Sequence, residues 1–245
     1  MLLLSILLCI PLFCLPLYIV YKPPQIVIRA LARRYPDVLW FVDVVAAEKV
    51  IALTIDDAPS RFTPEILRLL RDHDSHATFF CIGSQVTPNS LQAIISQGHE
   101  LGNHAMRDEA SVDLPPDKLR VQIEQVDEMI DEAYSELGIE RQSRFFRPGF
   151  GFFSNVMIEM VQSMGYQTVL GNVYPHDAQI PYPKINARHI LSMVQPGSII
   201  IVHDRREYTT RMLQVVLPAL KRRGYEIVTM SHLLSLGKST KRREN

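Results

Sequence analysis

Two adjacent carboxylates, Asp56 and Asp57, directly follow the apolar run of residues 50–55. Neighbouring residues of an extended chain point in opposite directions, so one acid can hold a metal ion while the other faces a reacting water. Acidic pairs at strand ends more often serve as turn or helix-cap residues. The pair therefore predicts metal-assisted hydrolysis only if further polar groups join it.

His104 and Asp108 are candidates to join it, because they are four residues apart. If a helical turn lies between them, both side chains share one face and can bind one ion. With Asp57 they would supply three protein ligands. A metal held in this way keeps open positions, lowers the pKa of bound water and polarises a carbonyl. The alternative interpretation makes His104 a strand-end residue and Asp108 the start of a turn.

Proton transfer needs a base and an acid, and the sequence offers one of each. Asp56, if it is not a metal ligand, is a candidate general base that Arg147 could keep ionised through a charge-assisted pair. His203 ends an almost purely apolar run, where an imidazole is costly unless it is bonded or functional. As a general acid it would protonate a leaving amine. The alternatives are an interface arginine and a core histidine bonded to the backbone.

Short apolar runs alternate regularly with helical patterns along the chain. Seven of them are predicted as strands: 50–55, 77–82, 100–103, 145–147, 167–170, 198–203 and 226–229. Such alternation predicts parallel strands joined by right-handed crossovers, and closing the sheet gives an α/β barrel. Functional groups of such barrels gather at the carboxyl ends of the strands. All the candidate residues above fall there, which predicts a single active site.

The helices between these runs have recognisable ends. Thr63 is predicted to cap a helix that starts at Pro64. Residues 117–137 carry an apolar stripe with alternating spacings of four and three, which indicates core packing, and Gly138 ends that helix. The remaining predicted helices cover residues 89–98, 154–164, 186–194 and 209–223.

The composition excludes some kinds of partner. Lys plus Arg and Asp plus Glu both total 26, so no basic excess favours a nucleic acid, and a neutral or mixed substrate fits better. The three cysteines predict no disulfide framework, because Cys9 and Cys14 lie in an apolar N-terminal segment and Cys81 in a predicted buried strand. None of these features predicts the oligomeric state.

Four segments, in this order, resemble the motifs of the polysaccharide deacetylases of the NodB homology type, carbohydrate esterase family four. They are Thr-Ile-Asp-Asp-Ala-Pro at 54–59, Gly-His-Glu-Leu-Gly-Asn-His at 98–104, Arg-Phe-Phe-Arg-Pro-Gly-Phe-Gly at 144–151 and Val-His-Asp at 202–204. The resemblance extends over residues 50–236. It implies a distorted (β/α)7 barrel, which agrees with the strand prediction.

The resemblance also implies catalytic roles. Asp56 would be the general base, with Arg147 as its partner, and His203 would be the general acid. Asp177 would orient His203. The backbone N–H of Phe150 would stabilise an oxyanion.

For the metal, the resemblance implies Asp57 and His104 as ligands, with Asp108 in place of the family's second imidazole. Zn²⁺ is the expected ion, and Co²⁺ or Mn²⁺ are alternatives. Because two carboxylates neutralise a divalent ion more fully than one, the bound water should be less acidic. Ile201 would line a small pocket for the acetyl group.

Two further features depart from the family pattern. Trp40 is the only tryptophan and precedes the predicted barrel, so Tyr174 or Tyr182 would have to stack on the sugar. Gly149 and Phe150 stand where the family has proline and tyrosine, which leaves the backbone donor in place.

The expected function is therefore metal-dependent removal of acetyl groups from N-acetylglucosamine residues of a chitin-like glycan. Two alternatives stay open. The first is a membrane-anchored glycan-binding protein whose catalysis is weakened or lost through Asp108. The second is a hydrolase of another C–N bond, in a small amide or cyclic imide.

Residues 1–21 carry no charged side chain and are long enough to cross a bilayer, which predicts a transmembrane anchor or signal segment. No clear cleavage site follows, which favours an uncleaved anchor. The basic residues after it would place the domain in the cytosol, whereas a glycan substrate points to the secretory pathway or cell surface, so the orientation stays open. The expected parts are the anchor at 1–21, a lead-in at 22–49, the deacetylase domain at 50–236 and a basic tail at 237–245.

Overall fold

The computed structural model describes residues 16–45 and 47–243, and it divides the chain into two compact units, Met1–Pro36 and Asp37–Asn245. The first unit contains a helical stretch at 16–21 and helix α2 (Gln25–Arg34), which ends on two arginines. Most of the predicted anchor, residues 1–15, lies outside the described residues. Within the described ranges, no helix combines the length and the apolar character needed to cross a membrane.

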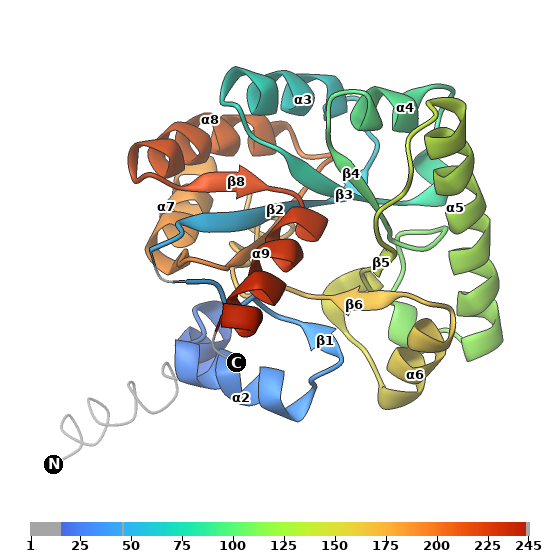
Figure 1. Cartoon of the computed structure of the whole chain (residues 1–245), viewed down its shortest axis with the longest axis horizontal. Helices are drawn as coiled ribbons and strands as arrows, with labels where there is room; N and C mark the ends of the chain where they lie inside the picture. The colour runs from blue at the N-terminus through green and yellow to red at the C-terminus, as the bar shows by residue number, and fades with distance from the viewer. Residues whose placement is uncertain (1–15, 46, 244–245) are drawn as a thin grey trace, which may run out of the picture. The chain divides into compact units, whose positions relative to one another are not determined.

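The second unit is built on a sheet of parallel strands (Figure 1). The strands are β1 (Val38–Leu39), β2 (Val50–Ala58), β3 (Ala77–Cys81), β4 (Glu100–Asn103), β5 (Phe145–Phe146), β6 (Gln167–Val169), β7 (Ile199–His203) and β8 (Glu226–Val228). All seven predicted strands are confirmed. Strand β1 was not predicted, because two residues are too few to show a periodic pattern.

The sheet curls without forming a complete ring of paired strands. Its order is β1-β6-β5-β4-β3-β2-β7, and β8 also pairs with β2. The long strand β2 accommodates both neighbours, since residues 52–56 pair with β7 and residues 50–52 with β8. A single bridge between Val173 and Ile200 links the chain after β6 to β7. The predicted α/β barrel is thus a curled half-barrel.

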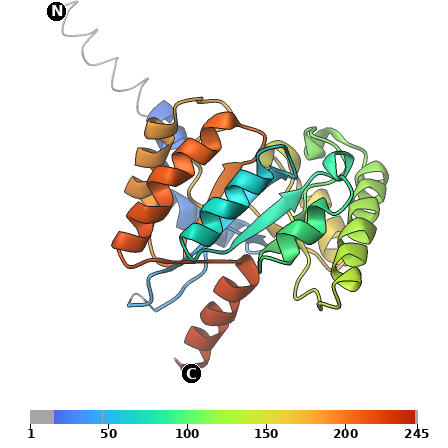
Figure 2. The ribbon, with the colours of Figure 1, turned by 90° about the horizontal axis from the view of Figure 1, so that it is seen from above.

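Helices cover the outside of this sheet. They are α3 (Thr63–Asp72), α4 (Ser90–Ile95), α5 (Pro116–Glu136), α6 (Asn155–Ser163), α7 (Pro183–Met193) and α8 (Glu207–Arg222). Helix α9 (Met230–Arg243) instead packs against the inner face, where its Met230 and Leu233 share a core cluster with Val50, Ala52 and Phe80. Figures 1 and 2 show α3 and α8 side by side along one face of the sheet. Helix α9 was not predicted, and it includes residues 237–243 of the expected basic tail.

Two helix starts differ from the prediction. Helix α3 begins at Thr63 itself, and its hydroxyl accepts a hydrogen bond from the Ser60 N–H and donates to Asp204. The prediction that Thr63 caps the helix is therefore wrong, because this hydroxyl is used in tertiary bonds. Helix α7 begins three residues earlier than predicted, at Pro183, a residue whose fixed φ suits a first helical turn.

Strand β2 forms the rigid centre of the unit. Every one of its nine residues is buried, as expected for a parallel strand covered on both faces. Four fully buried phenylalanines pack in the neighbouring strands: Phe79, Phe80, Phe145 and Phe146. The free thiol of Cys81 is buried among them, as the sequence predicts. Residues at the carboxyl end of β2 are consequently held in fixed positions.

Candidate active site

Asp56 and His203 lie side by side at the carboxyl ends of two paired strands. The parallel register of β2 and β7 matches Asp56 with His203, two steps beyond the match of Thr54 with Ile201. Paired residues of parallel strands present their side chains on the same face of the sheet, and so do residues two apart. The candidate base and the candidate acid therefore face the same space.

Arg147 binds Asp56 in the interior of the protein. Its Nη1 donates to Asp56 Oδ1 and to Thr54 Oγ1, both at 2.8 Å, and its Nε donates to the Val169 carbonyl at 3.1 Å. The side chain is 2% exposed, and this burial lowers the pKa of Arg147 while the Asp56 carboxylate opposes the change. The pair expected from the sequence is thus formed, and Thr54 is an additional partner that the sequence reasoning missed.

Asp57 and His104 form a pair that suits a cation. The Asp57 backbone has a φ of +62°, a strained value of the kind that clusters at functional sites, and its Oδ1 lies 3.7 Å from His104 Nε2. His104 Nδ1 lies 2.7 Å from the Arg147 carbonyl oxygen, which can only accept. In the neutral ring Nδ1 therefore carries the hydrogen, and Nε2 presents a lone pair to the carboxylate. Two acceptors facing each other fit a divalent metal ion.

The electrostatics of Asp57 reflect its position among other acids. Burial raises the pKa of Asp57, and the carboxylates of Asp56 and Asp108 act in the same direction. His104 and His203 oppose them. A positive charge at this point would relieve the repulsion between the buried acids.

Asp108 is held elsewhere. Its Oδ2 accepts a hydrogen bond from Arg205 Nη1 at 2.9 Å, and the side chain is 40% exposed. The segment between His104 and Asp108 contains no helical turn, and Ala105 has a φ of +60°, so the predicted shared helical face is wrong. Among the residues that the structure describes, no three His, Cys, Asp or Glu side chains are grouped closely enough to hold a metal ion. The residues present thus fit an ion at Asp57 and His104, and Asp108 as a further ligand stays a prediction.

Two arginines that the sequence analysis did not consider lie next to these acids. Arg206 Nη2 is 3.8 Å from Asp57 Oδ2, and Arg205 binds Asp108. The signal in the sequence is their position, since they follow directly on the His203-Asp204 motif. The loop that begins after His203 brings the residues that follow it to the same rim.

Asp177 fixes His203 through two hydrogen bonds. Its Oδ2 accepts from the His203 backbone N–H at 2.8 Å, and its Oδ1 lies 2.9 Å from His203 Nδ1. Asp177 is completely buried. Burial opposes a charge on the His203 ring, but the Asp177 carboxylate outweighs it together with Asp56 and Asp57, and the pKa of His203 rises to about 9.

Two of the three candidate substrate contacts, Tyr174 and Ile201, lie beside His203. The ring of Tyr174 packs edge-on to His203 with centroids 5.8 Å apart, and burial raises the pKa of Tyr174 to about 12. Ile201 is partly exposed, on the same face of β7 as His203. Tyr182, the other aromatic candidate, is 61% exposed at the start of α7.

Phe150 lies on the loop after β5, in a short 3₁₀ turn at Gly149–Gly151, with a φ of +62° and an exposed side chain. A Cβ atom at Gly149 would lie only 2.0 Å from the Glu109 carbonyl oxygen. Gly149 is therefore required by the loop that also carries Asp108. Two of the departures from the family pattern, at residues 108 and 149, are structurally linked.

Asp204 is a further residue that the sequence analysis did not assign. It is fully buried and accepts hydrogen bonds from the hydroxyls of Ser60 and Thr63 and from the Arg205 N–H. Its own N–H donates to the Asp56 carbonyl at 2.8 Å. Asp204 thus connects the loop after β7 to the loop after β2. Its hydrogen bond with the Arg205 N–H also fixes the backbone position of Arg205.

The comparisons with known proteins agree with this geometry. Residues 43–169 match the family model described as polysaccharide deacetylase. The chain is 33% identical over 195 residues to a peptidoglycan-N-acetylglucosamine deacetylase of Bacillus cereus, covering 76% of this chain and 89% of that protein. The chain belongs to the polysaccharide deacetylase family, carbohydrate esterase family four.

Two other relatives show the range of this family. A chitooligosaccharide deacetylase of a Bradyrhizobium species is 29% identical over 224 residues, which cover 83% of this chain and 96% of that protein. A solved structure of a family-four pseudoenzyme from Bacillus anthracis is 27% identical with a TM-score of 0.70, covering 78% of this chain and 67% of that one. Membership of the family is therefore found both in proteins named as deacetylases and in one named as a pseudoenzyme.

Proposed function

We propose that this protein is a metal-dependent deacetylase that hydrolyses the N-acetyl amide of N-acetylglucosamine residues in a chitin-like polysaccharide. One observation carries the proposal: two buried pairs, Asp56 with Arg147 and His203 with Asp177, stand next to each other across the β2–β7 register. A base held ionised and an acid held protonated at one point are what amide hydrolysis requires.

Asp57 and His104 are the residues that would hold the metal, with Zn²⁺ as the expected ion and Co²⁺ or Mn²⁺ as alternatives. A divalent cation there would acidify a water and polarise the amide carbonyl. The hydrogen bond from His104 Nδ1 to the Arg147 carbonyl orients the ring for this task. It also couples the ligand to the residue that binds the base.

The proton transfers follow from the two pairs. Asp56, bound by Arg147, takes a proton from the attacking water as the C–O bond forms. His203 is protonated at neutral pH because of its raised pKa, and it donates its proton to the amide nitrogen as the C–N bond breaks. The products are acetate and a free amine. Asp56 has then gained one proton and His203 has lost one, and return of a proton from Asp56 to His203 through solvent restores both residues for the next turnover.

Substrate contacts are proposed on the same rim. The Phe150 N–H would stabilise the oxyanion, Ile201 would contact the acetyl methyl group, and Tyr174 would stack on a sugar ring. The names of the two relatives, a peptidoglycan-N-acetylglucosamine deacetylase and a chitooligosaccharide deacetylase, support an N-acetylglucosamine-containing glycan.

The test is acetate release from chito-oligosaccharides with Zn²⁺, Co²⁺ or Mn²⁺ added. We expect wild-type protein to release acetate and Asp56→Asn to be slower by two or more orders of magnitude, which is roughly the contribution of a general base. A matched control is Asp117→Asn, an exposed acid in the first turn of α5. Equal rates for wild type and Asp56→Asn would remove Asp56 from the mechanism.

A second function has a specific observation in its favour. Arg205 and Arg206 neutralise Asp108 and Asp57, the two acids that the sequence predicts as ligands. A glycan-binding protein with weakened catalysis would show this arrangement, and the family includes a pseudoenzyme. Binding of chito-oligosaccharides without acetate release under any of the three metals would favour this function over the first.

A further inference from the structure

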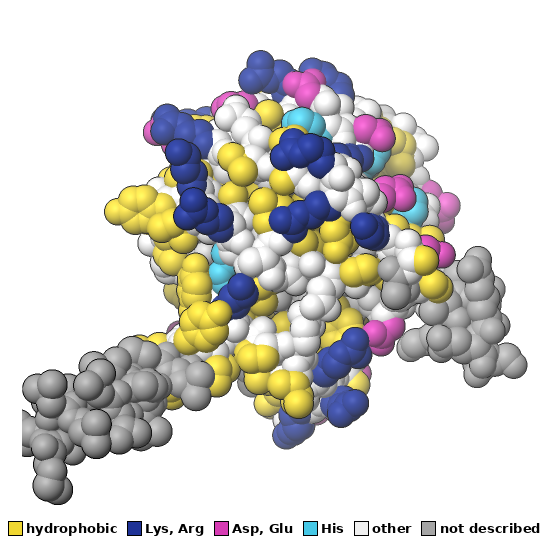
Figure 3. All heavy atoms as spheres, turned by 90° about the vertical axis from the view of Figure 1, so that its left-hand side faces the viewer, with side chains coloured by type: hydrophobic (Ala, Val, Ile, Leu, Met, Phe, Trp, Pro, Cys, Tyr) yellow, Lys and Arg dark blue, Asp and Glu magenta, His cyan; other side chains and the backbone are white. Residues whose placement is uncertain are grey.

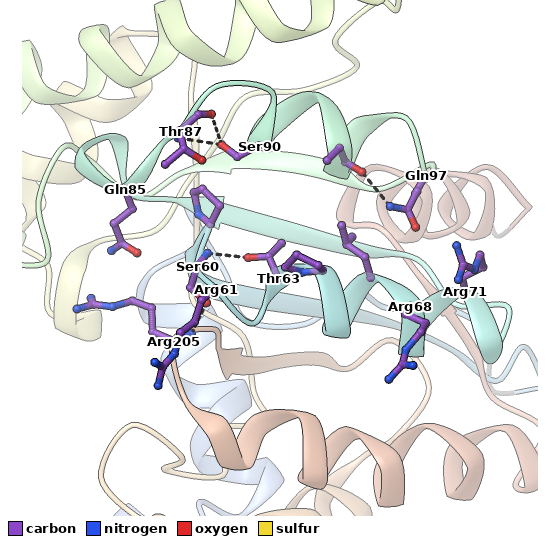
Figure 4. A pocket seen from close by; sticks show the side chains of 14 residues that line it. Ser60, Arg61, Thr63, Arg68, Arg71, Gln85, Thr87, Ser90, Gln97 and Arg205 are labelled. Carbon is purple, nitrogen blue, oxygen red and sulfur yellow. Dashed lines mark hydrogen bonds between the residues drawn. The ribbon is translucent and has the colours of Figure 1, made fainter.

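A cavity of about 850 Å³ lies outside the candidate active site, between helices α3 and α4 (Figure 4). Four of the residues that line it are arginines: Arg61, Arg68, Arg71 and Arg205. None of its lining residues is acidic. Figure 4 shows Arg61 and Arg205 at one end, near Ser60 and Gln85, and Arg68 and Arg71 along α3 toward the other end.

The spacing in the sequence explains this grouping. Arg68 and Arg71 are three residues apart and lie on one face of α3, while Arg61 lies in the turn that precedes the helix. Among the described residues, no carboxylate lies within ion-pair distance of Arg61 or Arg68, and Arg71 meets only its exposed neighbour Asp72, at 4.0 Å. The positive charges of these three guanidinium groups are therefore largely not balanced by carboxylates.

The rest of the lining suits a sugar. Apolar contacts come from Pro59, Pro64, Leu67 and Ala93, while the hydroxyls of Ser60, Thr87 and Ser90 supply hydrogen-bonding groups. Apolar walls with a few convergent polar groups are typical of ligand sites, and sugar rings present both kinds of surface. Guanidinium forks add a preference for carboxylate or sulfate oxygens, which they bind in bidentate geometry.

The cavity is connected to the candidate active site through Arg205. This residue lines the cavity, and it also binds Asp108 on the rim of the site. Pro59 and Ser60, at the same end, belong to the loop that follows Asp57. A polymer bound at the active site can thus place a neighbouring segment in the cavity.

We propose that this cavity binds an anionic segment of the polysaccharide substrate, so that the preferred substrate is an acidic glycan. The proposal rests on the proposed function for the identity of the polymer. The occupant follows from charge complementarity. The lining contains no acid and four arginines, of which Arg205 is paired with Asp108, and a glycan with carboxylate or sulfate groups complements the other three.

Positively charged side chains also occur away from the cavity. Figure 3 shows Lys and Arg side chains spread over the side of the molecule that bears α7 and α8. A matched control therefore removes two charges from that side, at Lys184 and Arg188, which are exposed on α7 and do not line the cavity.

The experiment measures binding in the Asp56→Asn background, so that no ligand is consumed. The ligands are a neutral chito-oligosaccharide and its carboxymethylated and O-sulfated forms of equal length, with polyglutamate as a non-glycan anion. Three proteins are compared. They are Asp56→Asn alone, Asp56→Asn with Arg68→Gln/Arg71→Gln, and Asp56→Asn with Lys184→Gln/Arg188→Gln. The readout is the ratio of the affinities for each anionic ligand and for the neutral one.

We expect the background to prefer an acidic glycan, and Arg68→Gln/Arg71→Gln to reduce the preference about fivefold, while the α7 control keeps it. The carboxymethylated and sulfated arms tell which anion is preferred. Equal affinity for neutral and acidic glycans, equal loss in the α7 control, or polyglutamate binding as tightly as the acidic glycan would each overturn the proposal. Acetate release by the wild type is measured separately, so charge-selective binding without release would contradict the proposed function alone.

Discussion

Arg205 Nη1 donates to Asp108 Oδ2 at 2.9 Å, so the carboxylate that the sequence predicts as a third metal ligand is bound to an arginine. If Asp108 is a metal ligand, binding of the ion has to compete with Arg205. We expect Arg205→Gln to bind Zn²⁺ more tightly by up to about fivefold, because a partly exposed ion pair is worth roughly 1 kcal/mol or less. Competition with a chromophoric chelator measures the affinity directly, without any turnover.

The control for this change is Arg205→Gln/Asp108→Asn. The double variant lacks the acid that the first change releases, so its Zn²⁺ affinity should return to the wild-type level or fall below it. If Arg205→Gln and wild type bind Zn²⁺ equally, Asp108 takes no part in the metal site.

The buried pair of Arg147 and Asp56 makes a prediction about stability. Arg147→Met leaves a carboxylate that is about as buried as before, 3% exposed, without its partner. Removing one member of a buried ion pair typically costs about 3–5 kcal/mol in the free energy of unfolding. Urea denaturation should show a loss of this size.

Arg147→Met/Asp56→Asn tests the origin of that loss. Because the double variant contains no unpaired charge, it should be less destabilised than the sum of the two single variants. Strict additivity would mean that Arg147 stabilises the protein through its bonds to Thr54 and Val169 and not through Asp56.

His203 predicts a pH dependence in protein freed of metal by a chelator. Its pKa in the folded state, about 9, lies above the ordinary value of 6.5. The stabilisation by its partner is therefore fully present below pH 6.5 and is lost as the pH rises to about 9. It amounts to something on the order of 3 kcal/mol.

Asp177→Asn should remove most of this dependence, because the amide gives the ring no negative partner. NMR titration of the His203 ring would show its pKa fall in the variant, and denaturation at several pH values would show the flatter profile. An unchanged ring pKa would assign the shift to Asp56 and Asp57 instead.

The sequence was sufficient for most of the fold. The seven strands could be predicted because a parallel sheet that is buried on both sides needs apolar runs. Strand β2, for example, is buried along its whole length. Besides helix α9, two features of the sheet were not predicted. Strand β1 has only two residues, and its pairing with β6 depends on residues more than a hundred positions away. The curl of the sheet depends on β2 accepting both β7 and β8, which no local pattern shows.

The sequence predicted the positions of site residues that directly follow a strand. It did not predict the positions of residues that depend on the conformation of an irregular loop. Asp56, Asp57 and His203 are placed by strand ends, so their juxtaposition follows from the strand order. Asp108 lies on an irregular loop, and the assumption of a helical turn after His104 was wrong. The contacts of Arg205 with Asp108 and of Arg206 with Asp57 depend on the course of the loop after β7, which no local sequence pattern shows.

The last prediction concerns His99, a buried histidine that has no role in the proposed mechanism. It is 5% exposed, and its Nδ1 accepts a hydrogen bond from the Ala77 N–H at 3.2 Å. Burial, together with the nearby ring of His76, lowers the pKa of His99 from 6.5 to about 4. The folded state therefore keeps this ring neutral, whereas the unfolded chain takes up a proton near pH 6.5.

The stability of the protein should consequently decrease as the pH falls from 6.5 to about 4, by an amount on the order of 3 kcal/mol from this residue. His99→Asn retains an acceptor for the Ala77 N–H but cannot be protonated in this range. We expect the variant to lose less stability between pH 7 and pH 4 than the wild type, as measured by urea denaturation. His73→Asn, a change at a less buried histidine, is the control and should leave the acid dependence intact. If His99→Asn and wild type lose stability in parallel, other groups carry the acid sensitivity and His99 is not protonated on unfolding.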